Sequence, residues 1–247
     1  MGNSPLVNYT KISPNRTSPR NHKIDTITVH CVVGQCSVET LGTIFAPKSR
    51  QASSNYGIGP DGRIGMYVEE KDRSWCSSNS ENDHRAITIE VASDTTHPYA
   101  VPDAAYDSLI KLLVDICKRN GIKKLMWKGD KTLIGKISEQ NMTVHRWFTN
   151  TACPGDYLYE LHGDIVEKVN TKLGVTSDVF KPYIVKVTIS DLNIRKGPGT
   201  NYEKTGKFTG KGAFTITEVR AGKGSIKGWG RLKSGAGWIS LDYATKV

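Results

Sequence analysis

The sequence predicts an α/β domain followed by a small all-β domain. Three observations support this prediction. The chain has 247 residues, which is longer than one typical domain. Up to Gly174, β-branched runs alternate with segments of helical periodicity. Beyond Gly174, short β-branched runs alternate with glycine and no segment has helical periodicity. We therefore expect domains at 1–174 and 183–247, joined by a linker at 175–182.

Two alternating, β-branched runs predict the central strands of the first domain. "IDTITVH" (24–30) ends in His30, and "RAITIEVA" (85–92) carries Glu90 near its end. Between these runs, "SVETLGTIFA" predicts a short helix with Ser37 as its N-cap. "GIGPDGRIGMYV" then predicts a hairpin that turns at Pro60–Asp61–Gly62.

The segment "PDAAYDSLIKLLVDICKRNG" predicts the clearest helix in the chain. Pro102 lies near its start and Gly121 follows its last basic turn. One apolar stripe runs along it, formed by Ala105, Leu109, Leu112, Leu113, Ile116 and Cys117. A second helix, "GDYLYELHGDIVEKVNTKLG", stops at Gly174. Strands that alternate with helices in this way predict an α/β core.

The positive charge of the chain is concentrated in its C-terminal part. Residues 181–247 hold thirteen Lys and Arg against four Asp and Glu, a net charge of +9, whereas the whole chain carries +10. A basic domain suits an anionic polymer, which includes nucleic acid, a membrane surface and a cell wall with phosphate and carboxylate groups. The alternative is a solvated basic face that only aids solubility.

The composition is that of a soluble protein made in a reducing compartment. No window approaches eighteen apolar residues, so no transmembrane segment is expected. The first 23 residues lack the apolar core of a secretory signal, so we expect synthesis in the cytoplasm and delivery to any external target by another route. The five cysteines lack disulfide or zinc-knuckle spacing, and Cys31, Cys76 and Cys117 are interpreted as small core residues.

Polar side chains at strand ends and in "HRWFTNTACPG" (145–155) are the candidates for chemistry. His145 and Cys153 are compatible with a metal site, a catalytic thiol with its base, or unrelated structural roles. With His30 they provide two imidazoles and a thiolate, which are zinc ligands. Three protein ligands leave the fourth tetrahedral position open, as in catalytic zinc sites.

The segments "ITVH", "AITIEVA" and "VHRWFTNTACPG", in this order, resemble the zinc-dependent N-acetylmuramoyl-L-alanine amidases of type 2. This group includes phage endolysins, bacterial autolysins and peptidoglycan recognition proteins, and the resemblance covers about residues 8–172. It implies a mixed β-sheet flanked by helices. It also implies a Zn²⁺ ion bound by His30, His145 and Cys153, with Glu90 as general base and then proton donor. Thr151 matches a position that helps to stabilise the oxyanion.

The resemblance suggests two substrate contacts, and at one of them this chain departs from the family pattern. Many relatives have Tyr-His before the "DG" turn, whereas this chain has "SSNYGIGPDG", with Tyr56 out of register. Tyr56 is a candidate substrate contact or a half-buried hairpin aromatic. Trp75, in "RSWCSSN", lies where relatives have a Trp-His or Trp-Ala pair lining the cleft, and it is a candidate for substrate contact or core packing. The remaining histidines match no ligand position: His22, His84, His97 and His162.

The C-terminal segments "LNIRKGPGTNYEKTGKF" and "GWGRLKSGAGWISLDY" resemble a bacterial SH3 (SH3b) domain, which implies attachment to the cell wall. Most of the residues that carry this resemblance are turn formers and core aromatics. Nucleic acid is not an expected partner, because "TGKFTG" and its neighbours lack the aromatic pattern of an RNA-binding sheet.

The expected function is hydrolysis of the amide between N-acetylmuramic acid and L-alanine in bacterial peptidoglycan. One alternative is a peptidoglycan-recognition protein that binds without cleavage. Another is a cell-wall cysteine peptidase with Cys153 as nucleophile and His145 as base, although in such families the nucleophile usually precedes its histidine. The sequence leaves open the oligomeric state and the choice between endolysin and autolysin, and the missing signal favours the endolysin.

Overall fold

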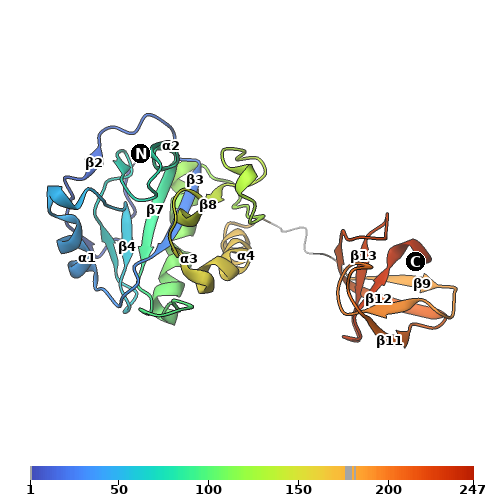
Figure 1. Cartoon of the computed structure of the whole chain (residues 1–247). Coiled ribbons are helices and arrows are strands. Elements are labelled where there is room, and N and C mark those ends of the chain that lie inside the picture. Colours follow the sequence, from blue (N-terminus) through green and yellow to red (C-terminus); the bar gives the residue numbers. More distant parts are fainter. Residues whose placement is uncertain (1, 176–179, 181) are drawn as a thin grey trace. The chain divides into compact units, whose positions relative to one another are not determined.

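The computed structural model describes residues 2–175, 180 and 182–247 (Figure 1). The chain divides into two compact units, residues 1–177 and 178–247, and each is considered by itself. Most of the linker predicted at 175–182 lies outside the described residues.

A six-stranded mixed sheet forms the centre of the first unit. Its neighbours are hydrogen-bonded in the order β1-β5-β4-β7-β3-β8, and only the β4–β5 pair is antiparallel among these described strands. The bounds are β1 Tyr9–Thr10, β3 Thr26–Cys31, β4 Tyr56–Ile58, β5 Ile64–Met66, β7 Ala86–Val91 and β8 Met142–Thr143. Two further strands, β2 (Arg16–Thr17) and β6 (Arg73–Ser74), pair separately. The α/β prediction is confirmed.

The two central strands have one apolar face and one polar face. β3 and β7 are parallel, and His30 lies directly opposite Glu90. Because successive side chains alternate between faces, the larger hydrophobic residues of β3 and β7 lie on one face, and the hydroxyls of Thr28 and Thr88 lie on the other with His30 and Glu90. The candidate residues His30 and Glu90 therefore lie on the polar face, and the main core of the unit lies on the apolar face.

Two long helices cover the apolar face. α3 (Asp103–Asn120) and α4 (Gly155–Lys172) pack against each other and against the central strands. All six residues of the predicted stripe on α3 are buried. The helix ends at Gly121, which adopts the left-handed conformation with φ of 69°. The predicted boundaries at Pro102 and Gly121 are confirmed.

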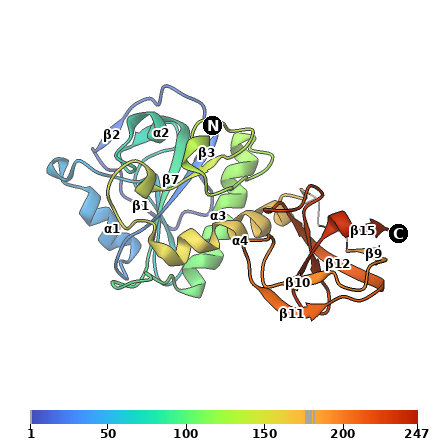
Figure 2. The ribbon, with the colours of Figure 1, turned by 45° about the vertical axis from the view of Figure 1, so that its right-hand side comes forward.

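Two shorter helices lie near the other strands. α1 (Val38–Phe45) has Ser37 as its N-cap, as predicted, and the Ser37 hydroxyl accepts a hydrogen bond from the Thr40 amide at 3.2 Å. Figures 1 and 2 show α1 on the side of the sheet away from α3 and α4. α2 (Ser80–Arg85) directly precedes β7. The short 3-10 segments η1 (Lys48–Arg50), η2 (Lys131–Leu133) and η3 (His145–Trp147) lie in the connections.

The second unit is a seven-stranded antiparallel sheet with its own apolar core. The strands follow the order β11-β10-β14-β13-β12-β9-β15. Their bounds are β9 Tyr183–Val187, β10 Asn193–Arg195, β11 Lys204–Phe208, β12 Gly212–Arg220, β13 Trp229–Leu232, β14 Trp238–Ser240 and β15 Ala244–Lys246, with a 3-10 turn η4 at Leu241–Tyr243. This all-β architecture fits the SH3-like fold that the sequence predicts.

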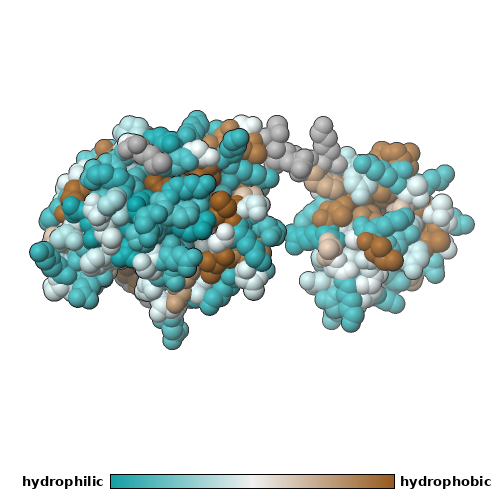
Figure 3. All heavy atoms as spheres, turned by 90° about the horizontal axis from the view of Figure 1, so that it is seen from above, coloured by the Kyte–Doolittle hydropathy of each residue, from teal (hydrophilic) through white to brown (hydrophobic). Residues whose placement is uncertain are grey.

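The surface seen in Figure 3 is largely hydrophilic on both units, with scattered hydrophobic side chains. Within the described part of the chain, no helix combines the length and apolar character needed to cross a bilayer.

Candidate metal centre

Three neighbouring parallel strands bring the candidate residues to one edge of the sheet. His30 lies near the carboxyl end of β3, and Glu90 lies at the paired position of β7. β8 runs parallel to β3 and leads directly into η3, which begins at His145. Cys153 lies two residues before α4. Because the carboxyl ends of parallel strands meet at one edge, residues far apart in the sequence meet here.

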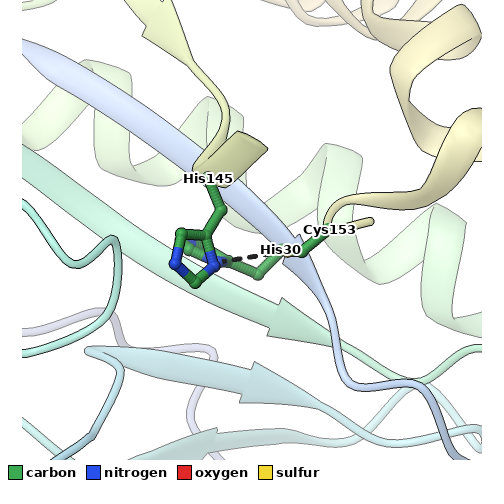
Figure 4. Close-up of side chains that lie close together, drawn as sticks. All are labelled: His30, His145 and Cys153. Atoms are coloured by element: carbon green, nitrogen blue, oxygen red, sulfur yellow. Dashed lines mark hydrogen bonds between the residues drawn. The ribbon is translucent and has the colours of Figure 1, made fainter. Parts of the chain in front are cut away.

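The donor atoms of His30, His145 and Cys153 converge (Figure 4). All three lie within 4.8 Å of one another, and Cys153 Sγ is 3.4 Å from His30 Nδ1. Two donors on one tetrahedral zinc ion, with bonds of about 2.3 Å to sulfur and about 2.0 Å to nitrogen, lie about 3.5 Å apart. The observed separation therefore fits a shared ion.

His30 has the properties of a preorganised ligand. Its side chain is buried, and Nε2 has no hydrogen-bond partner among the described residues. Burial, with a smaller contribution from His145, lowers the pKa of His30 to about 3. The imidazole is therefore neutral at physiological pH, which is the form that binds a metal.

His145 is oriented by a loop between β6 and α2. The Ser78 hydroxyl lies 3.2 Å from His145 Nε2, which leaves Nδ1 as the nitrogen available for a metal. Ser78 has a positive φ of 59°, a conformation that serine rarely adopts. The buried Asp83 carboxylate fixes this loop by accepting hydrogen bonds from the amides of Cys76 and Ser77 and from the Ser77 hydroxyl.

Cys153 lies in an environment that favours the neutral thiol in the absence of a metal. A hydrogen bond with Cys31, followed by burial, raises the pKa of Cys153 well above its ordinary value. Nucleophilic cysteines have lowered pKa values. The Cys153 amide donates to Thr151 Oγ1 at 3.3 Å, so Thr151 is placed directly beside the ligand segment.

Glu90 is partly exposed, but its carboxyl oxygen Oε2 is buried, and the residue lies next to the candidate ligand His30. Burial is the largest cause that raises its pKa to about 8, and the neighbouring Cys31 adds to the shift. Oε2 has no hydrogen-bond partner among the described residues, and Oε1 is 3.7 Å from Cys76 Sγ. Buried polar atoms without partners are uncommon, and they are typical of functional sites.

Comparison with known protein families identifies the family of this chain. Residues 20–156, more than half of the chain, match the family model described as N-acetylmuramoyl-L-alanine amidase. The chain belongs to this amidase family. This membership makes the first unit a peptidoglycan amidase domain and identifies bacterial peptidoglycan as the class of substrate. Among curated proteins, no match to the amidase was found.

Solved structures of amidases and endolysins resemble this amidase. A selenomethionine derivative of AmpD has a TM-score of 0.48 and 18% identity, and the match covers 67% of this chain and 95% of AmpD. The endolysin amidase LysCS from Clostridium intestinale has a TM-score of 0.44 and 21% identity, with 69% and 94% covered. A mutant endolysin from Bacillus subtilis has a TM-score of 0.46 and 16% identity, with 66% and 99% covered.

A cavity opens beside His145 in the amidase domain. It has a volume of about 270 Å³ and is lined by residues that include Arg73, Trp75, Cys76 and His145. Trp75 is partly exposed, and its indole N–H donates to Thr17 Oγ1 at 3.0 Å. The Arg73 guanidinium lies over the Trp75 ring at 5.9 Å. Trp75 is thus held rigidly at the rim of the candidate centre.

The expectation that Tyr56 contacts substrate is wrong. Tyr56 has no exposed surface and belongs to the core cluster of the amidase domain. Its hydroxyl donates to Glu70 Oε1 at 2.6 Å and accepts from the Ser4 amide at 3.0 Å. The physical reason is register: Gly57 pairs with Glu90, so Tyr56 points to the opposite face of the sheet.

The interpretation of Cys76 as a core residue is also wrong. Its side chain is partly exposed, lines the cavity, and contacts Glu90. Cys31, in contrast, is buried as expected, although its thiol adjoins Cys153. The one sequence signal that could have placed Cys76 in the site is its position next to Trp75, where relatives have a cleft-lining His or Ala.

Proposed function

We propose that the amidase domain is zinc-dependent and hydrolyses the amide between N-acetylmuramic acid and L-alanine of the stem peptide. His30, His145 and Cys153 would hold the ion. The observation that carries this proposal is the convergence of their three donor atoms within 4.8 Å. A zinc ion bound there would supply a Lewis acid for the scissile carbonyl and would lower the pKa of a water molecule at its open position.

Glu90 is proposed as the general base. A cation bound beside Glu90 would lower the pKa of its carboxyl, so that Oε2, which has no partner among the described residues, would accept the proton of the attacking water and then donate it to the departing nitrogen of L-alanine. The same buried carboxyl therefore serves both halves of the reaction. The adjoining strand position of His30 fixes Glu90 relative to the ligand set.

Thr151 and Trp75 are proposed to contact the substrate. The Thr151 hydroxyl oxygen already accepts the Cys153 amide, so its hydrogen remains available to donate to the oxyanion. Trp75 lines the cavity next to His145, where an aromatic face would pack against sugar or peptide. The neighbouring Arg73 adds a positive charge to this wall of the cavity.

The all-β domain is proposed to attach the enzyme to the cell wall. Its SH3-like fold and its net charge of +9 support binding to an acidic mesh of glycan and peptide. The enzyme would then act on the wall at which this domain holds it.

Mass spectrometry of digested peptidoglycan, with and without a chelator, tests the proposal. We expect free L-alanine amino termini and intact glycan strands, with release abolished by the chelator and restored by Zn²⁺. Cleavage within the peptide that resists the chelator and stops on thiol alkylation would instead identify a cysteine peptidase. Binding without any cleavage, with zinc present, would identify a recognition protein.

A further inference from the structure

A second set of metal-binding side chains lies beside the first. His30, Cys76 and Glu90 each offer a donor atom, and the three atoms lie within 4.8 Å of one another. Cys76 and Glu90 do not belong to the set formed by His30, His145 and Cys153. His30 is common to both sets, and its Nδ1 lies beside Cys153 Sγ of the first set.

The free atoms of this second set are the buried polar atoms that lack partners. Nδ1 of His30 is 3.4 Å from Cys153 Sγ, whereas Nε2 has no partner among the described residues. Glu90 Oε2 is likewise buried and without a partner there. Buried polar atoms without partners are uncommon, so two of them on residues of one set point to a ligand that satisfies both.

We propose that His30 Nε2, Cys76 Sγ and a Glu90 carboxylate oxygen form a second, weaker site for a soft divalent cation such as Zn²⁺ or Cd²⁺. Imidazole, thiolate and carboxylate are all accepted zinc ligands, and the thiolate excludes Mg²⁺ and Ca²⁺. Binding would release to the solvent the thiol proton of Cys76, the proton on His30 Nε2 and, where it is protonated, the proton of the Glu90 carboxyl. Cys76 Sγ and His30 Nε2 would then bond to the ion, and because these protons must be displaced, we expect this site to fill only at excess metal.

The structure provides a route for the ion. Cys76 is partly exposed and lines the cavity of about 270 Å³ that also contains His145 and Trp75. A cation in solution therefore reaches Cys76 without disturbing the apolar core.

Occupancy of this site would inhibit the enzyme, a consequence that rests on the proposed function. An ion on the Glu90 carboxylate occupies the lone pairs that accept the proton of water. Excess zinc would therefore suppress the activity that the first equivalent supports. This inhibition would depend on Cys76, a side chain outside the proposed catalytic set.

Metal stoichiometry tests the site independently of activity. The full-length protein is dialysed against increasing Cd²⁺ or Zn²⁺, and bound metal per chain is measured by elemental analysis. We expect two equivalents for the wild type, one for Cys76→Ala, and two for the matched control Cys36→Ala, which removes a partly exposed thiol outside both sets. With Cd²⁺, the thiolate-to-metal absorption should rise in a second step that Cys76→Ala loses. One equivalent in the wild type, or two in Cys76→Ala, would overturn the proposal.

Activity at excess metal tests the consequence separately. Each protein is compared with its own rate at one equivalent of Zn²⁺. Excess Zn²⁺ should inhibit the wild type and Cys36→Ala and should leave Cys76→Ala at its own rate. Two bound equivalents without inhibition would support the site and contradict the role of Glu90. Inhibition that persists in Cys76→Ala would contradict the inhibitory role of the site.

Discussion

At the scale of single residues, the candidate centre combines groups whose protonation is set by burial. The neutral His30 is prepared to bind a cation, and the carboxyl of Glu90 lies next to it without a full set of hydrogen bonds. Such an arrangement is costly for folding and is maintained because the surrounding strands fix both side chains. The cost is consistent with a functional site rather than a structural one.

Replacement of the proposed base should separate catalysis from metal binding. In Glu90→Gln the shape is retained and the proton acceptor is lost, so we expect the rate of L-alanine release to fall by about 10²–10⁴-fold. At one equivalent of Zn²⁺, the zinc content should remain that of the wild type, because Glu90 is not one of the three proposed ligands of the first site. Turbidity clearing of purified walls and elemental analysis provide the two measurements. Wild-type clearing by Glu90→Gln would exclude Glu90 as the base.

The residues of the centre differ in how far the sequence alone could predict them. His30 and Glu90 could be placed at strand ends because their strands alternate clearly. Tyr56 could not be placed, since a strand's inward and outward faces differ by one residue of register. Cys76 could not be placed because it lies in a loop whose path depends on Asp83, a contact between residues of different local segments.

At the scale of secondary-structure elements, hydrophobic periodicity was sufficient to predict the long helices and central strands. The stripe on α3, the N-cap of α1 and the β4–β5 hairpin all occur as predicted. Very short strands such as β1 and β8 carry too few residues for a periodic signal, and they are defined by pairing with longer strands.

Truncation in α3 should destabilise the amidase domain alone. Leu113 has no exposed surface and packs in the core cluster, so Leu113→Ala should lower the free energy of unfolding by about 2–5 kcal/mol. The exposed Lys111→Ala on the same helix should change it by less than about 0.5 kcal/mol. Denaturant unfolding followed by the far-ultraviolet helix signal measures this, because α1–α4 all lie in the first unit. Equal midpoints for the two variants would contradict this account of the core.

A buried histidine in α4 should make the amidase domain less stable in acid. Burial lowers the pKa of His162 to about 4, with a smaller effect from Arg146, while its ring packs on Trp127. As the pH is lowered, His162 becomes protonated near pH 6.5 in the unfolded chain and only near pH 4 in the folded chain. The free energy of unfolding therefore falls by roughly 3 kcal/mol between these two pH values. With a chelator present, the denaturant midpoint should fall less steeply in His162→Leu, as the pH is lowered, than in His97→Gln, the control at an exposed residue. Parallel curves for these two variants would refute the effect.

At the scale of the whole molecule, the two units have separate proposed roles: the first cleaves peptidoglycan and the second attaches the enzyme to the cell wall. The amidase part is nearly neutral, and the basic charge lies in the all-β part. The fold of each unit followed from local sequence patterns. The meeting of His30 with His145 and Cys153 did not, because it depends on strand order and on pairings across more than a hundred residues.

Wall binding should depend on salt through the all-β domain. With the Glu90→Gln protein, adsorption to purified walls should weaken as ionic strength rises, because the Debye length shortens to about 8 Å at 0.15 M. Replacing the exposed Lys207 and Lys211 by Glu should weaken adsorption further, whereas Lys111→Glu in the amidase domain should not. Adsorption that is independent of both salt and these lysines would contradict electrostatic attachment.

The most direct test of the central claim is anomalous X-ray diffraction at the zinc edge, on crystals of the protein loaded with one equivalent of Zn²⁺. We expect one strong peak at about 2.0–2.3 Å from a nitrogen of His30, a nitrogen of His145 and Cys153 Sγ. A peak bound by other side chains, or a fully loaded crystal with no peak among these three residues, would contradict the account.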